Sequence, residues 1–316
     1  MKKITLGTTE LKISPLIFGG NVFGWTLNEK ESFAMLDAIF EMGINCIDTA
    51  DVYSRWFPGN KGGESETIIG KWMKARGNRD EMIICTKVGM DVGQGGIDLS
   101  EKHILTSIDN SLKRLQTDYV DLYYAHKDDK TTAPSETLGA FKKLLDTGKI
   151  KHIGASNFSS ERLQQSLQLS EETGLPKYAV YQPEYNLLVR NNFSEENQML
   201  CKKHDLATVT YFSLASGLLT GKYSSKEDLD ASSRTDYVKK HWNKETRQAL
   251  KIIESISKNH TTSMAAVSLA WLLAQPQVTA PIVSATKKSH LIAFREAVSL
   301  QLSALEIEKL NKLRVS

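Results

Sequence analysis

Short runs of apolar residues alternate along the chain with longer segments in which apolar residues recur every three or four positions. The short runs have the length and composition of buried strands. There are eight of them, at residues 15–20, 43–48, 82–87, 119–126, 151–157, 177–183, 207–212 and 279–285. The segments between them show the helical period, as Phe33, Leu36, Ile39 and Phe40 do in the first. The pattern predicts a regular alternation of strand and helix.

Helices are expected wherever this period is joined to a capping signal. They are predicted near residues 29–42, 64–75, 134–147, 194–204, 244–258, 263–274 and 303–313, and three more begin near residues 100, 159 and 289. Ser159 is the expected cap of its helix. Residues 2–14 alternate weakly around a Gly-Thr-Thr turn and predict a β-hairpin.

The alternation of strands and helices predicts an α/β fold with a parallel sheet, since each parallel connection needs a crossover. Eight such units indicate a closed (β/α)8 TIM barrel. An open, doubly wound sheet is the alternative, but no GxGxxG follows the first strand. We expect one barrel domain over residues 1–316, with the hairpin within 1–14, an extended loop at 213–241 near the mouth, and extra C-terminal helices.

Composition narrows the class of protein. The chain has 316 residues, a net charge of +3 and basic residues scattered along it, so no nucleic-acid partner is expected. No apolar run is long enough to predict a membrane span or a leader peptide. The three cysteines suit reduced thiols in a cytoplasmic protein better than a disulfide framework. The seven histidines show no HxH or HExxH spacing, so no metal site is expected.

Reactive side chains stand at the ends of consecutive predicted strands. Asp48, Lys87 and His126 end the second, third and fourth strands and are separated by equal numbers of residues, and Tyr53 falls in the loop after Asp48. Because the carboxyl ends of all barrel strands meet at one face, these four side chains are expected to lie together. If Asp48 and Tyr53 are considered alone, a purely structural role stays open as the alternative, with Asp48 as a cap and Tyr53 as a packing residue.

Together these four residues have the chemistry of a proton-transfer site. A free tyrosine has a pKa of about 10, and a nearby ammonium lowers that value by roughly 1–3 units. Lys87 is expected to supply this charge, Asp48 to hold Lys87 in its protonated form, and His126 to orient a polar substrate atom beside the Tyr53 hydroxyl. The group suits the interconversion of a carbonyl and an alcohol, and it lacks an evident nucleophile for acyl or glycosyl transfer.

Sequence motifs then indicate a family. DTADVY, the strand end at Lys87, LYYAH, GASNF, QPEYNLLVR and YFSLASGLLTGKY resemble the aldo-keto reductase family in the same order, over nearly the whole chain. The resemblance implies hydride transfer between NADP(H) and a carbonyl carbon. It also implies Tyr53 as general acid/base, Lys87 as its activator, Asp48 as the partner of the lysine and His126 as the residue that orients the carbonyl.

The resemblance extends to the cofactor. It implies that Ser156, Asn157 and Gln182 hydrogen-bond the nicotinamide carboxamide and that the ring of Tyr211 stacks on the nicotinamide. The other matching or nearby positions are expected around the phosphates and at the first strand end: Gly20, Leu214, Gly217, Thr220, Lys222 and Arg234. A plain glycine turn and a solvated arginine are the alternative readings of Gly217 and Arg234.

The chain departs from the family after the eighth strand. Ser284, Thr286 and His290 align with cofactor-contacting positions, but Ala293 and Phe294 stand where the family often has a Glu-Asn pair. The departure weakens the expected contacts to the adenine end. The basic residues Lys287, Lys288 and His290 favour NADP(H), while NAD(H) stays possible, as does the alternative that the lysines are merely solvated.

The substrate is expected to be a small-molecule carbonyl compound. Trp25, Trp56 and Phe57 fall in loops at the predicted mouth and are candidates for an apolar pocket, although loop aromatics also pack structurally. Aldehydes, small ketones and sugar-derived carbonyls all stay open, as do the reaction direction and the oligomeric state. Two other readings compete: a cofactor-binding regulatory subunit of the potassium-channel β type, and a metal-dependent barrel hydrolase with Asp48 and His126 as ligands.

Overall fold

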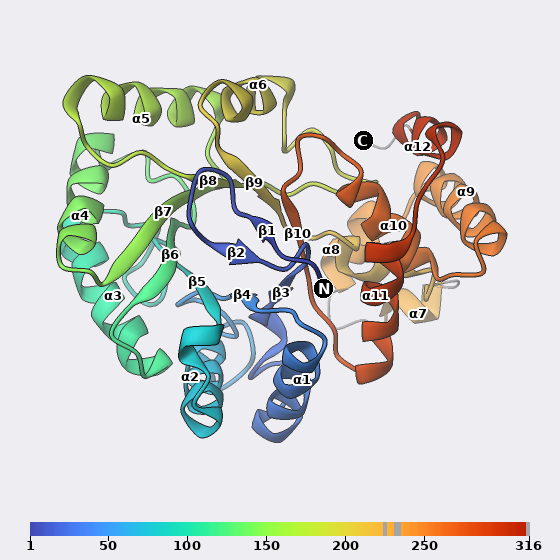
Figure 1. The fold of residues 1–316 in the computed structure, drawn as a ribbon, viewed down its shortest axis with the longest axis horizontal. Coiled ribbons are helices and arrows are strands. Elements are labelled where there is room, and N and C mark those ends of the chain that lie inside the picture. Colours follow the sequence, from blue (N-terminus) through green and yellow to red (C-terminus); the bar gives the residue numbers. More distant parts are fainter. Residues whose placement is uncertain (224–225, 231–234, 314–316) are drawn as a thin grey trace.

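The computed structural model describes residues 1–223, 226–230 and 235–313. Eight parallel strands form a closed barrel in which β10 pairs with both β3 and β9, as the alternation of strands and helices predicts (Figure 1). The strands are β3 Ile17–Gly19, β4 Cys46–Asp48, β5 Ile83–Val88, β6 Val120–Ala125, β7 Ile150–Ser156, β8 Val180–Gln182, β9 Ala207–Thr210 and β10 Ala280–Val283. The predicted (β/α)8 barrel is confirmed.

Helices surround the barrel and follow the predicted segments closely. They are α1 Glu29–Glu41, α2 Glu64–Arg76, α3 Glu101–Leu115, α4 Pro134–Asp146, α5 Ser160–Thr173, α6 Glu195–Lys203, α9 Lys244–Asn259, α10 Met264–Leu273, α11 Leu291–Ser299 and α12 Ala304–Asn311. Four short 3-10 turns are η1 Gly20–Val22, η2 Arg79–Glu81, η3 Ala215–Thr220 and η4 Lys288–His290.

Polar caps fix where many of these helices begin. Ser159 accepts a hydrogen bond from the Arg162 N–H, which confirms the predicted cap. Asn28 and Ser303 each form a reciprocal capping box with a glutamate three residues on. Such caps satisfy backbone N–H groups that the first helical turn leaves without partners.

The predicted loop at 213–241 is wrong in part, because the segment contains η3 and the helices α7 Lys226–Asp230 and α8 Thr235–His241. Leu229 and Val238 are buried, so α7 and α8 each contribute an apolar side chain to the core. Two helices of one or two turns, separated by polar residues, are too short to show a helical period in the sequence.

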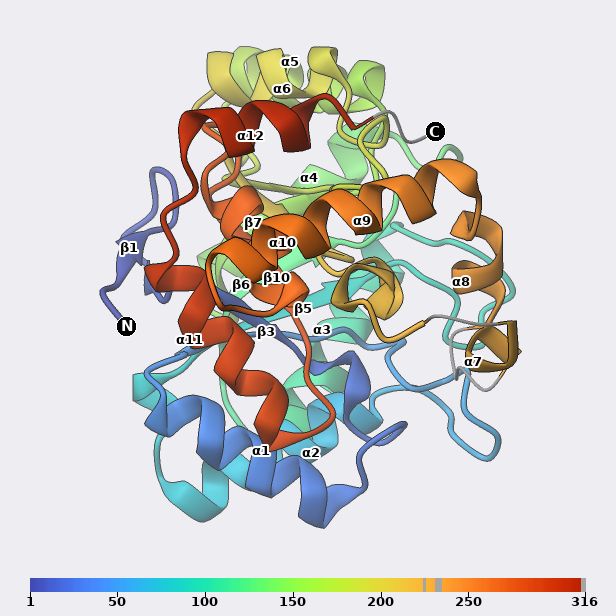
Figure 2. The ribbon, with the colours of Figure 1, turned by 90° about the vertical axis from the view of Figure 1, so that its right-hand side faces the viewer.

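The barrel has two distinct ends, which Figure 2 shows from the side. The hairpin of β1 Ile4–Thr5 and β2 Lys12–Ile13 lies at one end, beside the N-terminus, and α7 and α8 lie at the other. Asn45, just before β4, accepts from the Ser14 N–H and donates to the Lys12 carbonyl, which ties the hairpin to the N-terminal ends of the strands. The opposite end, where the strands terminate, is the end that carries active sites in barrels of this kind.

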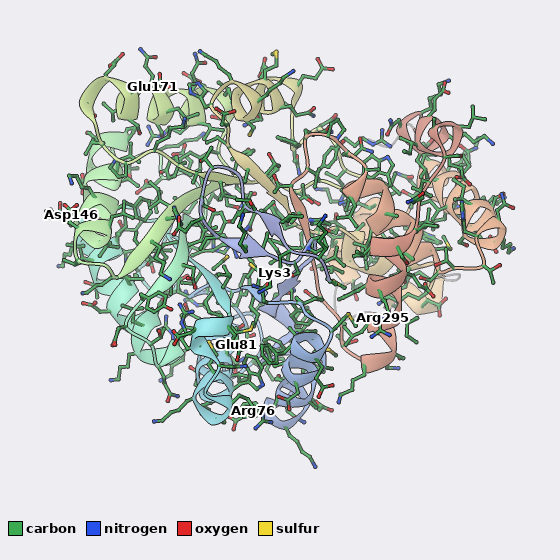
Figure 3. The ribbon with its side chains drawn as sticks, in the orientation of Figure 1. Lys3, Arg76, Glu81, Asp146, Glu171 and Arg295 are labelled. Atoms are coloured by element: carbon green, nitrogen blue, oxygen red, sulfur yellow. The ribbon has the colours of Figure 1, made fainter. Side chains whose placement is uncertain are left out.

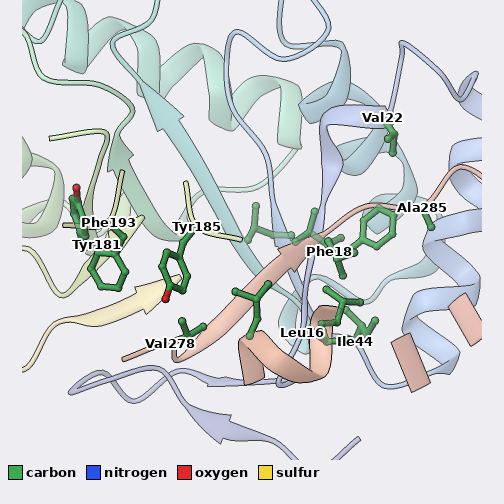
Figure 4. Packing of buried hydrophobic residues seen from close by; sticks show 14 of the residues in the cluster. Leu16, Phe18, Val22, Ile44, Tyr181, Tyr185, Phe193, Val278 and Ala285 are labelled. Atoms are coloured by element: carbon green, nitrogen blue, oxygen red, sulfur yellow. The ribbon is translucent and has the colours of Figure 1, made fainter. Parts of the chain in front are cut away.

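Apolar side chains fill the space between barrel and helices, as Figure 4 shows for Phe18, Tyr181 and Tyr185 among others. Charged side chains such as Arg76, Asp146 and Glu171 project from the outer helices (Figure 3). No helix in the described part of the chain is long and apolar enough to cross a membrane.

Candidate active site

The structure brings Asp48, Tyr53 and Lys87 into direct contact, with His126 beside them. Asp48 is the last residue of β4, Lys87 lies near the end of the neighbouring β5, and His126 follows β6. Parallel pairing places these strand ends side by side. Tyr53 reaches back over them from the turn after β4, and its ring centroid lies 6.0 Å from that of His126.

Lys87 is fully buried and has three oxygen acceptors. Its Nζ donates to Asp48 Oδ1, to the Thr49 carbonyl at 2.8 Å and to the Tyr53 hydroxyl at 3.0 Å. Burial opposes the charge on Lys87, but the adjacent Asp48 carboxylate and Tyr53 together raise its pKa above the ordinary value. The lysine is therefore held as an ammonium ion against the phenol.

Tyr53 differs from the sequence-based expectation in its net pKa. Its hydroxyl lies 3.3 Å from Asp48 Oδ1 as well as 3.0 Å from Lys87 Nζ. Burial raises the pKa of Tyr53 to about 12, and Asp48 adds to this, while the Lys87 ammonium lowers it. Lys87 acts in the predicted direction, but burial outweighs it, so the phenol is protonated at neutral pH.

His126 is held as a neutral imidazole. Burial, and after it the charge on Lys87, lower the pKa of His126 well below 6.5. Its backbone N–H donates to the Val88 carbonyl at 2.8 Å, and among the described residues its buried Nδ1 has no hydrogen-bond partner. His126 therefore has a ring nitrogen that is not committed to another protein group.

A second group of predicted residues adjoins this one. Gln182, at the end of β8, donates from Nε2 to Asp48 Oδ2 at 2.9 Å, a role that the sequence does not indicate. Ser156 donates to the Gln182 carbonyl at 2.8 Å. Asn157 adopts a left-handed backbone (φ 57°), which asparagine tolerates, and it donates to the His126 carbonyl at 3.0 Å. Tyr211 donates to Asn157 Oδ1 at 2.7 Å.

The glycine turn after β9 is tightly wound. Three consecutive residues, Ala215, Ser216 and Gly217, have positive φ, and Thr220 donates to the Gly217 carbonyl at 2.8 Å. A Cβ on Gly217 would lie 2.8 Å from Lys222 Nζ, so glycine lets the lysine lie against the turn. The buried hydroxyl of Ser216 has no partner among the described residues. Leu214, just before η3, is partly buried.

Basic residues of two loops face one another beside this turn. Burial lowers the pKa of His290, and the charges of Lys287 and Lys222 lower it further, so the imidazole of His290 and the two ammonium groups share one region. Among the described residues, neither lysine pairs with a carboxylate. Thr286 is exposed, and Phe294, which replaces the expected polar residue, is buried in the core.

The remaining predicted cofactor residues are Ser284, Gly20 and Arg234. Ser284, after β10, donates to the Gly19 carbonyl at 2.8 Å and to Asn21 Oδ1 at 2.7 Å, and Asn21 gave no signal in the sequence. Gly20 is buried, and a Cβ there would lie 3.2 Å from the Asp48 carbonyl. Arg234 lies outside the described residues.

Aromatic rings extend from Tyr53 towards solvent. The Trp56 ring meets that of Tyr53 edge-on at 5.9 Å and that of Trp25 at 5.5 Å. Trp56 is 48% exposed and Phe57 45% exposed. Trp56 and, behind it, Trp25 thus form an apolar wall beside the ring of Tyr53, and Phe57 is an exposed residue further along the same loop.

A further contact beside the site involves residues that the sequence did not single out. Tyr237 of α8 donates to Glu184 Oε1 at 2.6 Å, and its ring lies 4.7 Å from that of Phe212. These contacts hold α8 over the ends of β8 and β9. In the described part of the chain, no three His, Cys, Asp or Glu side chains group together as metal ligands would.

Comparison with known proteins agrees with this geometry. The sequence profile of the Aldo/keto reductase family matches residues 15–315. An uncharacterized oxidoreductase of Bacillus subtilis is 34% identical over 99% of this chain and 96% of its own length. L-glyceraldehyde 3-phosphate reductase of Escherichia coli is 29% identical over 97% and 90%. A probable voltage-gated potassium channel subunit beta of rice is 33% identical over 95% and 92%.

Three findings lead to one assignment. They are the match of the family profile over nearly the whole chain, the closed parallel barrel, and the relatives that are named as oxidoreductases. The chain belongs to the aldo/keto reductase family, whose members are oxidoreductases of carbonyl compounds.

Proposed function

We propose that this protein reduces an aldehyde or ketone to an alcohol with NADP(H), and that Tyr53 donates the proton. The observation that carries the proposal is the position of the Tyr53 hydroxyl, 3.0 Å from the buried Lys87 ammonium and 3.3 Å from Asp48. A group in these contacts, at the face where barrel strands end, is placed for general acid catalysis.

Proton transfer follows from the charges around the phenol. Tyr53 is protonated at neutral pH, so it has a proton to give to the carbonyl oxygen as negative charge develops there. Lys87, held charged by Asp48, stabilises the phenolate that remains. Neutral His126 offers a ring nitrogen to the same carbonyl oxygen and so orients it. The protonated form of Tyr53 that reduction requires is therefore the form present at neutral pH.

The residues present fit a nicotinamide dinucleotide. When bound, the nicotinamide supplies the hydride. Ser156, Asn157 and Gln182 present amide and hydroxyl groups at the strand ends beside Asp48 and His126, where a carboxamide needs donors and acceptors. The ring of Tyr211 is anchored by Asn157 in the same place. We assign these four residues to the nicotinamide end of the cofactor.

The phosphate groups of the cofactor fit the glycine turn that follows β9. The positive-φ turn at Ser216 and Gly217 has a buried hydroxyl with no partner in the described part of the chain, and Lys222 lies against the turn. Concave turns with nearby cations are typical anion sites. Lys287 adds positive charge from the neighbouring loop, and the uncharged imidazole of His290 beside it adds a hydrogen-bonding group. On this ground we assign the preference to NADP(H) over NAD(H). Leu214, Thr220, Ser284 and Thr286 complete the proposed cofactor residues.

The relatives point to two kinds of substrate, since one is named for a phosphorylated aldehyde and another as an aryl-alcohol dehydrogenase. The aromatic wall of Trp25 and Trp56 beside Tyr53 suits an apolar or aromatic carbonyl compound. Arg55 on the same loop is already paired with Asp91. We therefore favour an uncharged substrate with an apolar group next to its carbonyl.

We also assign the protein to the cytoplasm. Its three cysteines are free and buried, and Cys46 and Cys85 lie with their sulfur atoms 3.7 Å apart without a bond. Neighbouring free thiols persist best in a reducing compartment.

The test begins with tryptophan fluorescence during separate titrations with NADPH and NADH. Absorbance at the nicotinamide band is then followed after addition of aromatic aldehydes, short aliphatic aldehydes and glyceraldehyde 3-phosphate. Tighter binding of NADPH and its oxidation by aromatic aldehydes are expected. Binding without turnover across the panel would support a cofactor-dependent regulatory role instead, and binding of neither nucleotide would overturn the proposal.

A further inference from the structure

A buried acid outside the catalytic group lies on the segment that carries Tyr53. Asp51 stands two residues before Tyr53, and its backbone N–H donates to the Lys87 carbonyl at 3.3 Å. The Thr49 N–H likewise donates to the Cys85 carbonyl at 2.8 Å, so pairing with β5 continues beyond the end of β4. The position of Asp51 therefore helps to set the position of the Tyr53 hydroxyl over Lys87.

The side chain of Asp51 is enclosed without hydrogen-bond partners. The residue is only 4% exposed, and among the described residues both carboxyl oxygens lack a partner. Tyr123 of β6, a fully buried neighbour in charge interaction with Asp51, also has an unpartnered hydroxyl. A full negative charge in such a place is strongly disfavoured unless a cation faces it.

The cations near Asp51 already have carboxylate partners. Arg114 of α3 donates from Nε to Glu66 Oε2 of α2 at 2.7 Å, and Lys87 of β5 is bound to Asp48. The other oxygen of Glu66 accepts from Thr86 at 2.5 Å, which leaves Glu66 as a buried carboxylate facing Asp51. Burial, and next the charge on Glu66, raise the pKa of Asp51 well above its ordinary value, against the lowering effects of Arg114, the Val52 N–H and Lys87. The Val52 N–H is adjacent in the chain but does not reach hydrogen-bond geometry with either carboxyl oxygen.

A more distant acid does not change this balance. Asp109 of α3, which also acts on Tyr123, is largely exposed and pairs with Lys149. The groups that face Asp51 from β5, β6, α2 and α3 thus comprise two cations that are already paired, one further carboxylate and one phenol.

We propose that Asp51 is a neutral carboxylic acid in the folded protein at neutral pH, and that in this form it is a positioning residue that holds the segment 49–53, and with it Tyr53, against Lys87. The statement about charge stands on the surroundings of Asp51 alone, whereas the statement about Tyr53 rests on the proposed function. Ionisation of Asp51 would favour its movement out of the enclosed position towards water, which would displace Tyr53.

Infrared spectroscopy tests the charge without any need for turnover. The wild-type protein at pH 7 is expected to show the carbonyl stretch of a protonated carboxylic acid, shifted in D₂O. Asp51→Asn should remove this band, while Asp118→Asn, which changes an exposed carboxylate, should leave it unchanged. A wild-type spectrum at pH 7 from which Asp51→Asn subtracts no such band would overturn the proposal.

Thermal unfolding against pH gives an independent readout of the charge. The pKa of Asp51 in the folded state is raised above its unfolded value of about 3.9. Folding therefore takes up a proton, and the stability associated with the neutral acid is lost as pH rises from about 4 towards the folded pKa. The Tm of Asp51→Asn should rise relative to wild type as pH increases, and that of Asp118→Asn should not. Parallel curves for Asp51→Asn and wild type would contradict the neutral acid.

Kinetics tests the positioning role. Asp51→Ala should lower kcat about tenfold or more with little change in the Kd for NADPH. Asp51→Asn, which keeps the shape of the neutral acid, should restore most of kcat and extend activity to higher pH. Equal kcat values for the two variants, or an unchanged alkaline limb in Asp51→Asn, would contradict the role. If Asp51→Asn does not fold, Asp51→Ser takes its place in all three measurements.

The outcomes separate this inference from the proposed function. A protein without turnover on any carbonyl compound would overturn the proposed function, while the infrared and unfolding measurements would still decide the charge of Asp51. A working reductase whose Asp51→Asn variant matches wild type in all three measurements would overturn the inference alone.

Discussion

Lys87 illustrates how the environment determines the chemistry of a single residue in this protein. A lysine that is fully buried tends to lose its proton, yet Lys87 has a carboxylate, a carbonyl and a phenol around its ammonium group. The result is a fixed positive charge that is directed at one hydroxyl. Replacement of each member of the group is therefore expected to change a different measurable property, such as kcat or the pH dependence of stability.

Replacement of Tyr53 by phenylalanine removes only the hydroxyl. The Tyr53→Phe ring retains its edge-on contacts with Trp56 and His126, but the proton donor to the carbonyl oxygen is lost. We expect kcat for aldehyde reduction to fall by about 10²–10⁴-fold, the usual contribution of a general acid. The Kd for NADPH, measured by tryptophan fluorescence, should change little. Tyr119→Phe, which alters a tyrosine just before β6, is the control, and turnover of Tyr53→Phe near the wild-type value would contradict the mechanism.

Because His126 is held neutral, we expect the folded protein to lose stability in acid. Burial and Lys87 keep its folded pKa well below the unfolded value of about 6.5, so the unfolded chain binds a proton that the folded one does not. The stability that neutral His126 contributes is present above pH 6.5 and is lost as pH falls below it, at about 1.4 kcal/mol per pH unit.

Urea unfolding at pH 8 and pH 5 measures this loss. Wild type should lose more stability than His126→Gln over this range, by up to about 2 kcal/mol, because pH 5 lies roughly 1.5 units below the unfolded pKa. His152→Gln, which changes a histidine that contacts Glu10 of the hairpin, should not abolish the difference. The same pH dependence in wild type and His126→Gln would show that the imidazole is not held neutral.

At the residue scale the sequence predicts which side chains meet but not the balance of their interactions. Asp48, Lys87 and His126 could be placed together because the ends of parallel strands meet at one face. The net rise in the pKa of Tyr53 could not be predicted, since it depends on how completely Tyr53 is buried. The Gln182 contact with Asp48 escaped prediction because an amide bears no sign of which neighbour it will bind.

At the scale of elements, the approach of α2 to α3 depends on one glycine. A Cβ on Gly70 of α2 would lie 2.3 Å from the Arg114 carbonyl oxygen and 2.6 Å from the Leu115 carbonyl carbon, which are backbone atoms that cannot turn aside. At the same position on Gly139 of α4, no atom of the described residues lies within 4 Å, apart from the neighbouring backbone of its own helix.

These two glycines make a matched pair of alanine variants. Gly70→Ala should lower the free energy of unfolding by about 1–3 kcal/mol or more, because the two helices must separate. Gly139→Ala should raise it by about 0.5–1 kcal/mol, because alanine is the better helix former. Denaturant unfolding followed by circular dichroism measures both, and equal signs for the two variants would contradict the close contact of α2 and α3.

Helices that are long enough to show the helical period are predictable from the sequence, and helices of one or two turns are not. The helix α9 shows an apolar stripe over four turns, in which Ala249, Leu250, Ile253 and Ile256 are buried, and this stripe predicts the helix to within one residue at each end. The helix α8 has seven residues, of which Val238 alone is fully buried, so the sequence shows no helical period there and predicts a loop. Its position depends on the contact of Tyr237 with Glu184, which joins residues far apart in the chain.

At the scale of the whole molecule, the eight repeated units made the closed barrel predictable, and the hairpin shows how its two ends differ. Leu6, Leu11 and Ile13 of the hairpin pack against the apolar side chains inside the barrel. The hairpin therefore closes one end of the barrel, as Figures 1 and 2 show. Asp48 and Lys87 stand near the carboxyl ends of their strands, at the other end of the barrel. In a barrel of this kind, residues that carry the chemistry and residues that mainly stabilise the fold are expected to lie at opposite ends.

Leu6→Ala tests this separation. Leu6 is fully buried against the barrel interior, so its truncation should lower the free energy of unfolding by about 2–5 kcal/mol. Within the described residues, no hydrogen bond, ion pair or ring contact joins the hairpin to the catalytic group, so kcat and KM for an aldehyde should stay within about twofold of wild type well below the Tm. Leu305→Ala, at a position that is 69% exposed, is the control and should change neither quantity. A fall in kcat without a fall in stability would mean that the closed end of the barrel takes part in positioning Lys87 and Tyr53, and that the two ends are not independent.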